Sequence, residues 1–519
     1  MAFVPRGNKI QNAEETTHTI TSLNDNMDRN AKDDSQRKPE TFRSFVEDTS
    51  MHGARFLFGN NIFRRGFWTV LLVLSSGYCI FQIYASVQFY YQRPFNIKIT
   101  KIMPKRETSL PFPAVTLCNL NLFNLRRYRR YQIGKNLTTE TIEGKRYAIA
   151  KLLARSEDVF NNETKKEHLE LFWRFYGEVP EVFFLNLFSH EIEEMLLPRT
   201  IFNSCLYDET ACGPENFTQF ISSTYGRCYT FNSGKDGHPV LNATMAGQLN
   251  GLRLLLNIEI ESYLENPLNP FAGLTVLIHD QNTFPFMEQF GFVVQPGVRT
   301  LCSIKRKKIQ NLEHPYATNC IKNGKLEKLE SIKNSYSKPG CLMECLGKFV
   351  IAKCGCRPVE YRDLQVPLCA PNDTVLCLFP TYRKYGKSTF KDKCEESCRE
   401  PCQHTEYETS LSYAGLHRNV FADKLSSRVN LTKNFSLYEQ FLSFSDREKK
   451  EYIEENIISL DIFFHDMSYD EIEQTKAYEA WTLLANLGGT FGLFLGASMI
   501  TILEILEFIM RKIWSNICN

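Results

Sequence analysis

Apolar residues are concentrated in two runs near the ends of the chain, and polar residues dominate between them. Residues 66–91 contain no Asp, Glu, Lys or Arg, and residues 480–510 contain only Glu504 and Glu507. About 20 apolar residues allow a helix to cross a lipid bilayer. The pattern therefore predicts two membrane-spanning helices, which we place at residues 66–91 and 478–510.

Pairs of basic residues flank both runs on their outer sides, at positions 64–65 and 511–512. Basic residues are retained on the cytoplasmic side of a membrane. We therefore expect cytoplasmic termini at 1–65 and 511–519 and an extracellular segment at 92–477.

Two further features agree with this topology. Fifteen of the 17 cysteines lie between the runs, and the exceptions are Cys79 and Cys518. Extracellular cysteines commonly pair as disulfides. Candidate glycosylation sequons also lie only in this segment, at Asn136, Asn162, Asn216, Asn242, Asn372, Asn430 and Asn434.

The extracellular segment combines strand and helix patterns. Residues 252–260, 273–280 and 457–464 are rich in β-branched and apolar residues and predict strands. Residues 167–177 and 190–197 predict helices. The mixture predicts an α+β membrane protein.

Ten cysteines fall between Cys320 and Cys402. This density is typical of a disulfide scaffold. Bound zinc is the alternative, because closely spaced thiolates also bind metal. The extracellular setting favours disulfides over a metal site, and so does the scarcity of histidine, with only ten in the whole chain. The sequence does not fix which cysteines pair.

Composition changes this picture in two ways. A net charge of +2 argues against a nucleic-acid partner, and a mean hydropathy of −0.30 argues against a transporter with many spans. That average describes a large polar segment that dilutes two apolar runs. The polar residues 1–41 are predicted to be disordered.

The second run contains features that a simple anchor does not need. Four glycines, at positions 488, 489, 492 and 496, weaken a helix but allow close packing in lipid. Ionisable residues within a span usually face water or a partner. Several chains, each contributing one such helix, could line a pore in which Glu504 and Glu507 form rings that attract cations. The alternative places both carboxylates at the cytoplasmic interface beside Arg511.

Several ordered motifs resemble the epithelial sodium channel/degenerin superfamily. FPAVTLCN (residues 112–119) follows the first run, Met51-His52-Gly53 precedes it, and GLFLGASMITILEILE (residues 492–507) lies within the second run. GRCYTFNSG and LDIFFHDMSYDEIEQTKAYE are most similar to the acid-sensing ion channel subfamily, and the whole chain is most similar to its bile acid-sensitive members.

The resemblance implies a plasma-membrane channel, a homotrimer or a heterotrimer with related subunits, that conducts sodium ions and is blocked by amiloride. It implies a hand-like extracellular domain with palm, knuckle, finger, β-ball and thumb, the thumb lying at about residues 320–402. It implies bile acids as the activator, and neither enzymatic activity nor a cofactor.

The resemblance also assigns residues. The selectivity filter would be Gly496, Ala497 and Ser498, the pore carboxylates Glu504 and Glu507, and the gating residues Ala485, His52 and Gly53, the last two in a re-entrant segment at 51–65. The disulfides would be Cys118–Cys228, Cys205–Cys212, Cys320–Cys402, Cys341–Cys398, Cys345–Cys394, Cys354–Cys377 and Cys356–Cys369, which leaves Cys302 unpaired.

The chain departs from proton-gated relatives at their paired carboxylates. The first pair reads Glu261-Ser262, and the partners across the pocket read Phe379 and Arg383. An arginine opposite Glu261 would stabilise its charged form. We therefore expect that protonation of this pocket does not open the channel.

Other functions remain as alternatives. A proton-gated or constitutively open channel, or a regulatory subunit that needs related subunits, fits the same motifs. An ectoenzyme or receptor with two anchors is disfavoured because His190-Glu191 begins an HExxH pattern whose second histidine is replaced by Glu194. An ATP-gated trimeric channel has the same topology but different motifs.

Overall fold

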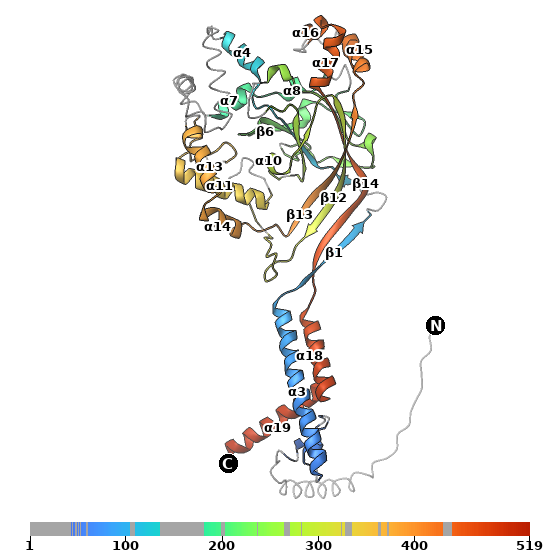
Figure 1. Cartoon of the computed structure of the whole chain (residues 1–519), viewed down its shortest axis with the longest axis vertical. Helices are drawn as coiled ribbons and strands as arrows, with labels where there is room; N and C mark the ends of the chain where they lie inside the picture. Colours follow the sequence, from blue (N-terminus) through green and yellow to red (C-terminus); the bar gives the residue numbers. More distant parts are fainter. Residues whose placement is uncertain are drawn as a thin grey trace, which may run out of the picture. The chain divides into compact units, whose positions relative to one another are not determined.

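The computed structural model describes residues 43, 45–46, 49, 51, 53–58, 61–103, 109–134, 181–198, 203–235, 237–263, 270–281, 283–322, 324–326, 335–361, 365–370, 373–428 and 438–518. The chain divides into two compact units. Both chain ends, residues 1–94 and 476–519, form the first unit, and residues 95–475 form the second (Figure 1).

The first unit is helical. Its elements are the 3-10 helix η2 (Ala54–Phe58) and the α-helices α3 (Ile62–Tyr91), α18 (Ala480–Leu495) and α19 (Met499–Cys518). Asn61 caps the start of α3, and its side chain accepts hydrogen bonds from the N–H groups of Phe63 and Arg64. Helices α3 and α18 pack against each other (Figure 1).

Within the described residues, α3 is the one unbroken helix that is long and apolar enough to cross a membrane. The helix expected at 478–510 is present as two helices, α18 and α19, which are bent by 79° at their junction. This pair has the length and composition of one further span that is broken in the middle.

A seven-stranded sheet dominates the second unit. Its strands are β1 (Phe95–Ile102), β4 (Cys205–Tyr207), β5 (Thr210–Ala211), β9 (Leu252–Asn257), β12 (Val298–Gln310), β13 (Gln403–Gly415) and β14 (Ile457–Lys476). Their order is β13-β12-β14-β9-β4-β5, and β1 also pairs with β14. Strand β12 is antiparallel to β13 and parallel to β14, and its pairing with β14 shifts register between Ile304 and Arg306.

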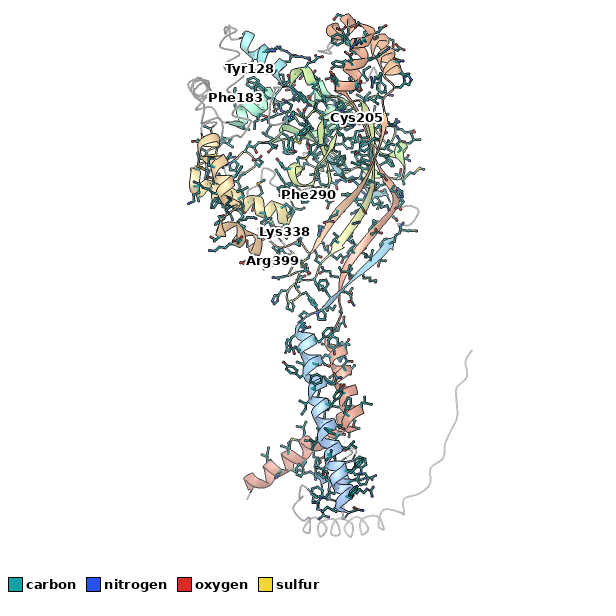
Figure 2. All side chains as sticks on the ribbon, viewed as in Figure 1. Tyr128, Phe183, Cys205, Phe290, Lys338 and Arg399 are labelled. Atoms are coloured by element: carbon teal, nitrogen blue, oxygen red, sulfur yellow. A yellow bond between two sulfur atoms is a disulfide. The ribbon has the colours of Figure 1, made fainter. Side chains whose placement is uncertain are left out.

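A five-stranded sheet has the order β11-β10-β3-β7-β6. It consists of β3 (Ala114–Asn119), β6 (Phe217–Ser222), β7 (Gly226–Phe231), β10 (Leu274–His279) and β11 (Phe292–Val294), and a small sheet pairs β2 (Leu110–Pro111) with β8 (Asn242–Ala243). Every residue of β3, the middle strand of this sheet, is buried. Apolar side chains of both larger sheets form one core cluster, and side chains fill the space around them (Figure 2).

Helices surround these sheets. They are α4 (Leu125–Gly134), α7 (Glu181–Phe188), α8 (Ile192–Met195), α10 (Met287–Phe290), α11 (Lys338–Cys354), α13 (Phe379–Tyr385), α14 (Thr389–Ser397), α15 (Arg418–Arg428), α16 (Tyr438–Ser443) and α17 (Asp446–Asn456), with a π-helical turn η7 (Thr374–Leu378) and 3-10 turns η4 (Pro214–Asn216), η5 (Gln248–Asn250) and η6 (Ile260–Ser262). Helices α15, α16 and α17 share a separate apolar cluster.

Three strand predictions agree with the structure to different extents. The strand expected at 273–280 is β10, and the strand expected at 457–464 is the first part of the longer β14. The strand expected at 252–260 ends at Asn257, because Glu259 has a left-handed backbone with φ of 53° and a 3-10 turn follows.

The helix predictions are less accurate. Only Ile192–Met195 of the helix expected at 190–197 is helical, since Leu196 already forms a β-bridge with Leu256. The helix expected at 167–177 lies outside the described residues.

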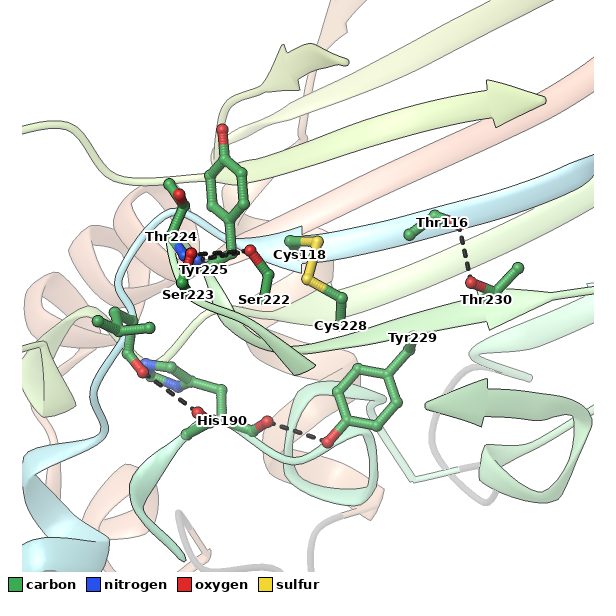
Figure 3. Close-up of a disulfide and its surroundings, with 12 residues drawn as sticks. Thr116, Cys118, His190, Ser222, Ser223, Thr224, Tyr225, Cys228, Tyr229 and Thr230 are labelled. Carbon is green, nitrogen blue, oxygen red and sulfur yellow. Dashed lines mark hydrogen bonds between the residues drawn. A yellow bond between two sulfur atoms is a disulfide. The ribbon is translucent and has the colours of Figure 1, made fainter. Parts of the chain in front are cut away.

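Seven disulfides join the same cysteine pairs that the family resemblance implies. Cys345–Cys394 connects α11 to α14, and Cys341–Cys398 connects α11 to the residue that caps the end of α14. The two cysteines on each side are four residues apart, which is about one helical turn. Cys118–Cys228 links directly opposed residues of β3 and β7 (Figure 3). Cys302 is buried and unpaired.

Candidate functional site

The junction between α18 and α19 coincides with the expected filter residues. Gly496 adopts a left-handed conformation, with φ of 59° and ψ of 21°, and its N–H donates to Gly492 O at 3.1 Å. The N–H of Ala497 donates to Phe491 O at 3.3 Å. A left-handed glycine that satisfies the last carbonyls is the usual way for a helix to end.

The next residue starts the following helix. The side chain of Ser498 accepts from the N–H of Thr501 at 3.4 Å, and the N–H of Ser498 donates to Thr501 Oγ1 at 3.0 Å. Serine is a preferred N-cap residue. In the tripeptide Gly-Ala-Ser, Gly496 therefore ends α18 and Ser498 caps the start of α19. The chain bends between the two helices.

Small residues form a stripe on α18 before this bend. Ala485, Gly488, Gly489 and Gly492 recur at spacings of three and four, so they lie on one side of the helix. Ala485 is exposed, and a Cβ added at Gly488 or Gly489 would meet no described atom within 4 Å. Such a surface allows close approach of another helix.

The segment before the first span packs on α3. Gly53 has a φ of 82°, and a Cβ there would lie 2.9 Å from the Trp68 ring, so both backbone and space require glycine. The ring of Phe56 lies 4.9 Å from that of Trp68, and the Arg64 guanidinium lies 4.2 Å from the Phe56 centroid. His52 lies outside the described residues.

The two glutamates of α19 have different surroundings. Glu504 is half-buried, and its carboxylate accepts from Thr49 Oγ1 at 3.3 Å. Glu507 is exposed and pairs with Arg511 one turn later. The rings of Phe45 and Phe508 stack at 4.5 Å. The structure thus brings Glu504 into contact with the segment before α3, whereas Glu507 pairs with Arg511 on its own helix.

The His-Glu dipeptide belongs to a buried polar network of the second unit. Burial and the nearby Arg127 and Arg126 lower the pKa of His190 to about 3. Its Nδ1 lies 3.4 Å from Asn124 Nδ2, and its carbonyl accepts from Tyr229 Oη at 3.0 Å (Figure 3). No group of His, Cys, Asp or Glu among the described residues could hold a metal ion.

The expected proton pocket is described only in part. Glu261 is exposed and Ser262 is buried. Residues 379 and 383 lie on α13, and their side chains lie outside the described set.

A buried carboxylate next to this position was missed from the sequence. Glu259 is 2% exposed and pairs with Arg126 at 3.0 Å. Glu259 lies within the strand predicted at 252–260. There, the alternation of apolar and polar residues does not distinguish a buried ion pair from an exposed charge. An early end of that strand, at the polar Asn257, was the available signal.

Only two of the seven sequons are described. Asn216 and Asn242 are both exposed. The Oδ1 of Asn216 accepts from Gly213 N at 2.9 Å, which leaves its amide nitrogen, the atom that would carry a glycan, outside this bond. The other five sequon asparagines lie outside the described residues.

Comparison with known proteins identifies the class to which this arrangement belongs. The family model described as "Amiloride-sensitive sodium channel" matches residues 45–508. The chain belongs to this family.

Its relatives are acid-sensing ion channels. The chain is 32% identical over 486 residues to acid-sensing ion channel 1C of Danio rerio, covering 91% of this chain and 84% of that protein. It is 31% identical over 490 residues to acid-sensing ion channel 2 of Rattus norvegicus, covering 92% and 87%. These relatives are ion channels, which agrees with the expected absence of enzymatic activity.

Proposed function

We propose that the chain is a subunit of a trimeric, sodium-permeable and amiloride-sensitive cation channel of the plasma membrane, with both termini in the cytoplasm. The observation that carries this proposal is the broken second apolar run, whose bend falls at Gly496, Ala497 and Ser498. Membership of the amiloride-sensitive sodium channel family supports it.

The proposed route for ions passes these three residues. Where one helix ends and another begins, backbone carbonyls can be left without helical hydrogen bonds and can replace the water shell of an ion. The carbonyl of Ser498 accepts from the N–H of Ile502 at 3.3 Å, so the carbonyls of Gly496 and Ala497 are the ones proposed for this role. A single chain presents one such set, so a ring requires copies of this chain or related subunits. The uncovered stripe from Ala485 to Gly492 is where neighbouring α18 helices would approach, and bulky side chains at 485 would hold the pore open.

Glu504 is the stronger candidate for a carboxylate that faces permeating cations. A carboxylate within a span must face water or a partner, and Glu504 is half-buried, with its carboxylate accepting from Thr49 Oγ1 at 3.3 Å. Glu507 is partly neutralised by Arg511. His52 and Gly53 belong to the re-entrant segment that would contact the cytoplasmic side of the pore.

The proposed stimulus is a bile acid rather than a proton. The support is the overall similarity to bile acid-sensitive members and the replacement of a paired carboxylate by Ser262. Like charges that share a site raise each other's pKa and so make a proton sensor, and Ser262 removes one of those charges.

Expression of the chain alone in oocytes tests these proposals. We expect amiloride-sensitive sodium current with bile acids, and little activation by a step from about pH 7.4 to about 6. Strong acid activation that Glu261→Gln abolishes would contradict the proposed stimulus. An absence of current under every condition would contradict a self-sufficient homotrimer.

A further inference from the structure

A loop of the cysteine-rich segment is held rigidly after α11. The loop comprises residues 355–361, and the disulfide Cys356–Cys369 attaches it to the segment that follows. The N–H of Cys369 donates to Arg357 O at 3.0 Å, and the Arg357 guanidinium donates to Tyr361 O at 2.7 Å. These bonds fix the loop from both sides.

The tip of this loop is buried against other elements. Val359 and Glu360 are each 8% exposed. Val359 belongs to an apolar cluster that includes Leu185 of α7 and Ile221 of β6. The loop is therefore a contact between the cysteine-rich segment and the body of the second unit.

The carboxylate of Glu360 reaches the turn between β6 and β7. Its Oε1 accepts the backbone N–H of Ser223 at 2.7 Å. The turn is already ordered, because Ser222 Oγ accepts from the N–H groups of Thr224 and Tyr225 at 3.1 and 3.3 Å (Figure 3). Among the described residues, no lysine or arginine forms an ion pair with Glu360, although a buried carboxylate usually has one.

We propose that Glu360 is a proton-operated clamp: its neutral carboxyl holds the cysteine-rich segment on the β6–β7 turn, and its ionised form loosens this contact. The physical reason is that a buried charge without a cation is costly, whereas a neutral carboxyl can be buried with its hydrogen bond retained. This clamp is separate from the pocket around Glu261.

The charges around the clamp favour this assignment. Glu288 of α10 is a charged group near enough to act on Glu360, and Arg227 of β7 is paired with Glu191. Arg357 donates to Tyr361 O and to Val366 O. The side chains of the turn, of residues 182–188 in α7 and of residues 365–370 carry no formal charge.

The direction of the pH effect follows from these surroundings. Burial raises the pKa of Glu360, the hydrogen bonds from Ser223 lower it, and the negative charge of Glu288 raises it, with a net increase. A raised pKa in the docked state means that docking is most stable below the ordinary pKa of glutamate. That stability is lost as pH rises through the raised value.

Hydrogen–deuterium exchange on the detergent-solubilised full chain tests the clamp without depending on ion conduction. After correction for intrinsic exchange, we expect protection of the amides at 222–225 to fall by about tenfold between about pH 5 and 8. Glu360→Gln, which stays neutral, should remove this dependence. Glu396→Gln, an exposed glutamate of α14, is the matched control and should behave like the wild type.

A wild type whose protection does not change with pH, or a Glu360→Gln variant with unchanged pH dependence, would overturn the proposal. If Glu360→Gln does not fold, Glu288→Gln replaces it, because loss of that neighbouring charge should move the transition to lower pH. An unmoved transition in Glu288→Gln would likewise overturn the clamp.

Discussion

The two apolar runs have similar lengths and compositions but different backbones. Helix α3 continues for 30 residues through Gly66 and Gly77, whereas the second run is divided at Gly496 into α18 and α19. Hydropathy treats the runs as equivalent. The difference shows that apolar length predicts where a long apolar helix lies, while the local conformation of one glycine decides whether that helix continues or bends.

The same substitution should therefore act with opposite sign in the two runs. Alanine favours a helix by about 1 kcal/mol over glycine at an ordinary helical position. At a left-handed position, alanine is disfavoured by roughly 1–2 kcal/mol. Gly77 is of the first kind and Gly496 of the second.

The largest expected effect comes from Gly496→Ala. It should shift the balance between bent and straight forms of the second run by about 5- to 30-fold toward the straight form, and amiloride-sensitive current should fall severalfold at equal surface expression. Gly77→Ala is the matched control and should leave the current unchanged. Equal currents from both variants would show that the bend has no functional role.

Ala485→Phe tests whether the stripe on α18 faces neighbouring subunits. A bulky ring should prevent close approach of the α18 helices and raise the resting amiloride-sensitive current severalfold, which whole-cell recording without any stimulus measures. Leu74→Phe on α3, where the side chain is 66% exposed, is the control and should leave resting current at the wild-type level. If Ala485→Phe has no more resting current than the wild type, the stripe does not face neighbouring subunits.

Gly53→Ala tests the segment that packs on α3. The added methyl would combine a φ of 82° with a 2.9 Å approach to Trp68, at a cost of about 1–2 kcal/mol. We expect altered open probability in single-channel recordings without loss of expression. Gly66→Ala, at a position with open space, should be silent, and an equally silent Gly53→Ala would contradict the packing described for this segment.

The smallest effect separates the two carboxylates of α19. Glu504→Gln should reduce single-channel sodium conductance, because a ring of charge is removed from the proposed ion path. Glu507→Gln should have little effect, since Arg511 already offsets that charge. The reverse order of conductances would assign the ion path to the other side of the helix.

Much of the first unit was accessible from sequence. The residues of α3 follow directly from the apolar run, and the bend was also encoded, because a glycine stop is followed by a serine start with Thr501 three residues later. The prediction of one helix at 478–510 overlooked this signal, since hydropathy averages over the junction. The 3-10 turn η2 carries no periodic pattern that would reveal it.

The second unit shows a different limit. Spacing alone left the pairing of the ten clustered cysteines open, and family resemblance supplied the pairs that the structure contains. Long-range contacts such as Glu360 with Ser223 join residues 137 positions apart, and no local pattern encodes them. Glu259 was missed for the same reason, because its partner Arg126 lies on a distant helix.

The sodium-to-potassium permeability ratio tests the central claim most directly. It is obtained from reversal potentials in oocytes that express the chain with substitutions at Gly496 and Ser498, beside the Gly77→Ala control. We predict that substitutions at the bend lower this ratio while Gly77→Ala preserves it. An unchanged ratio in variants that still conduct would contradict the assignment of the Gly-Ala-Ser bend as the filter.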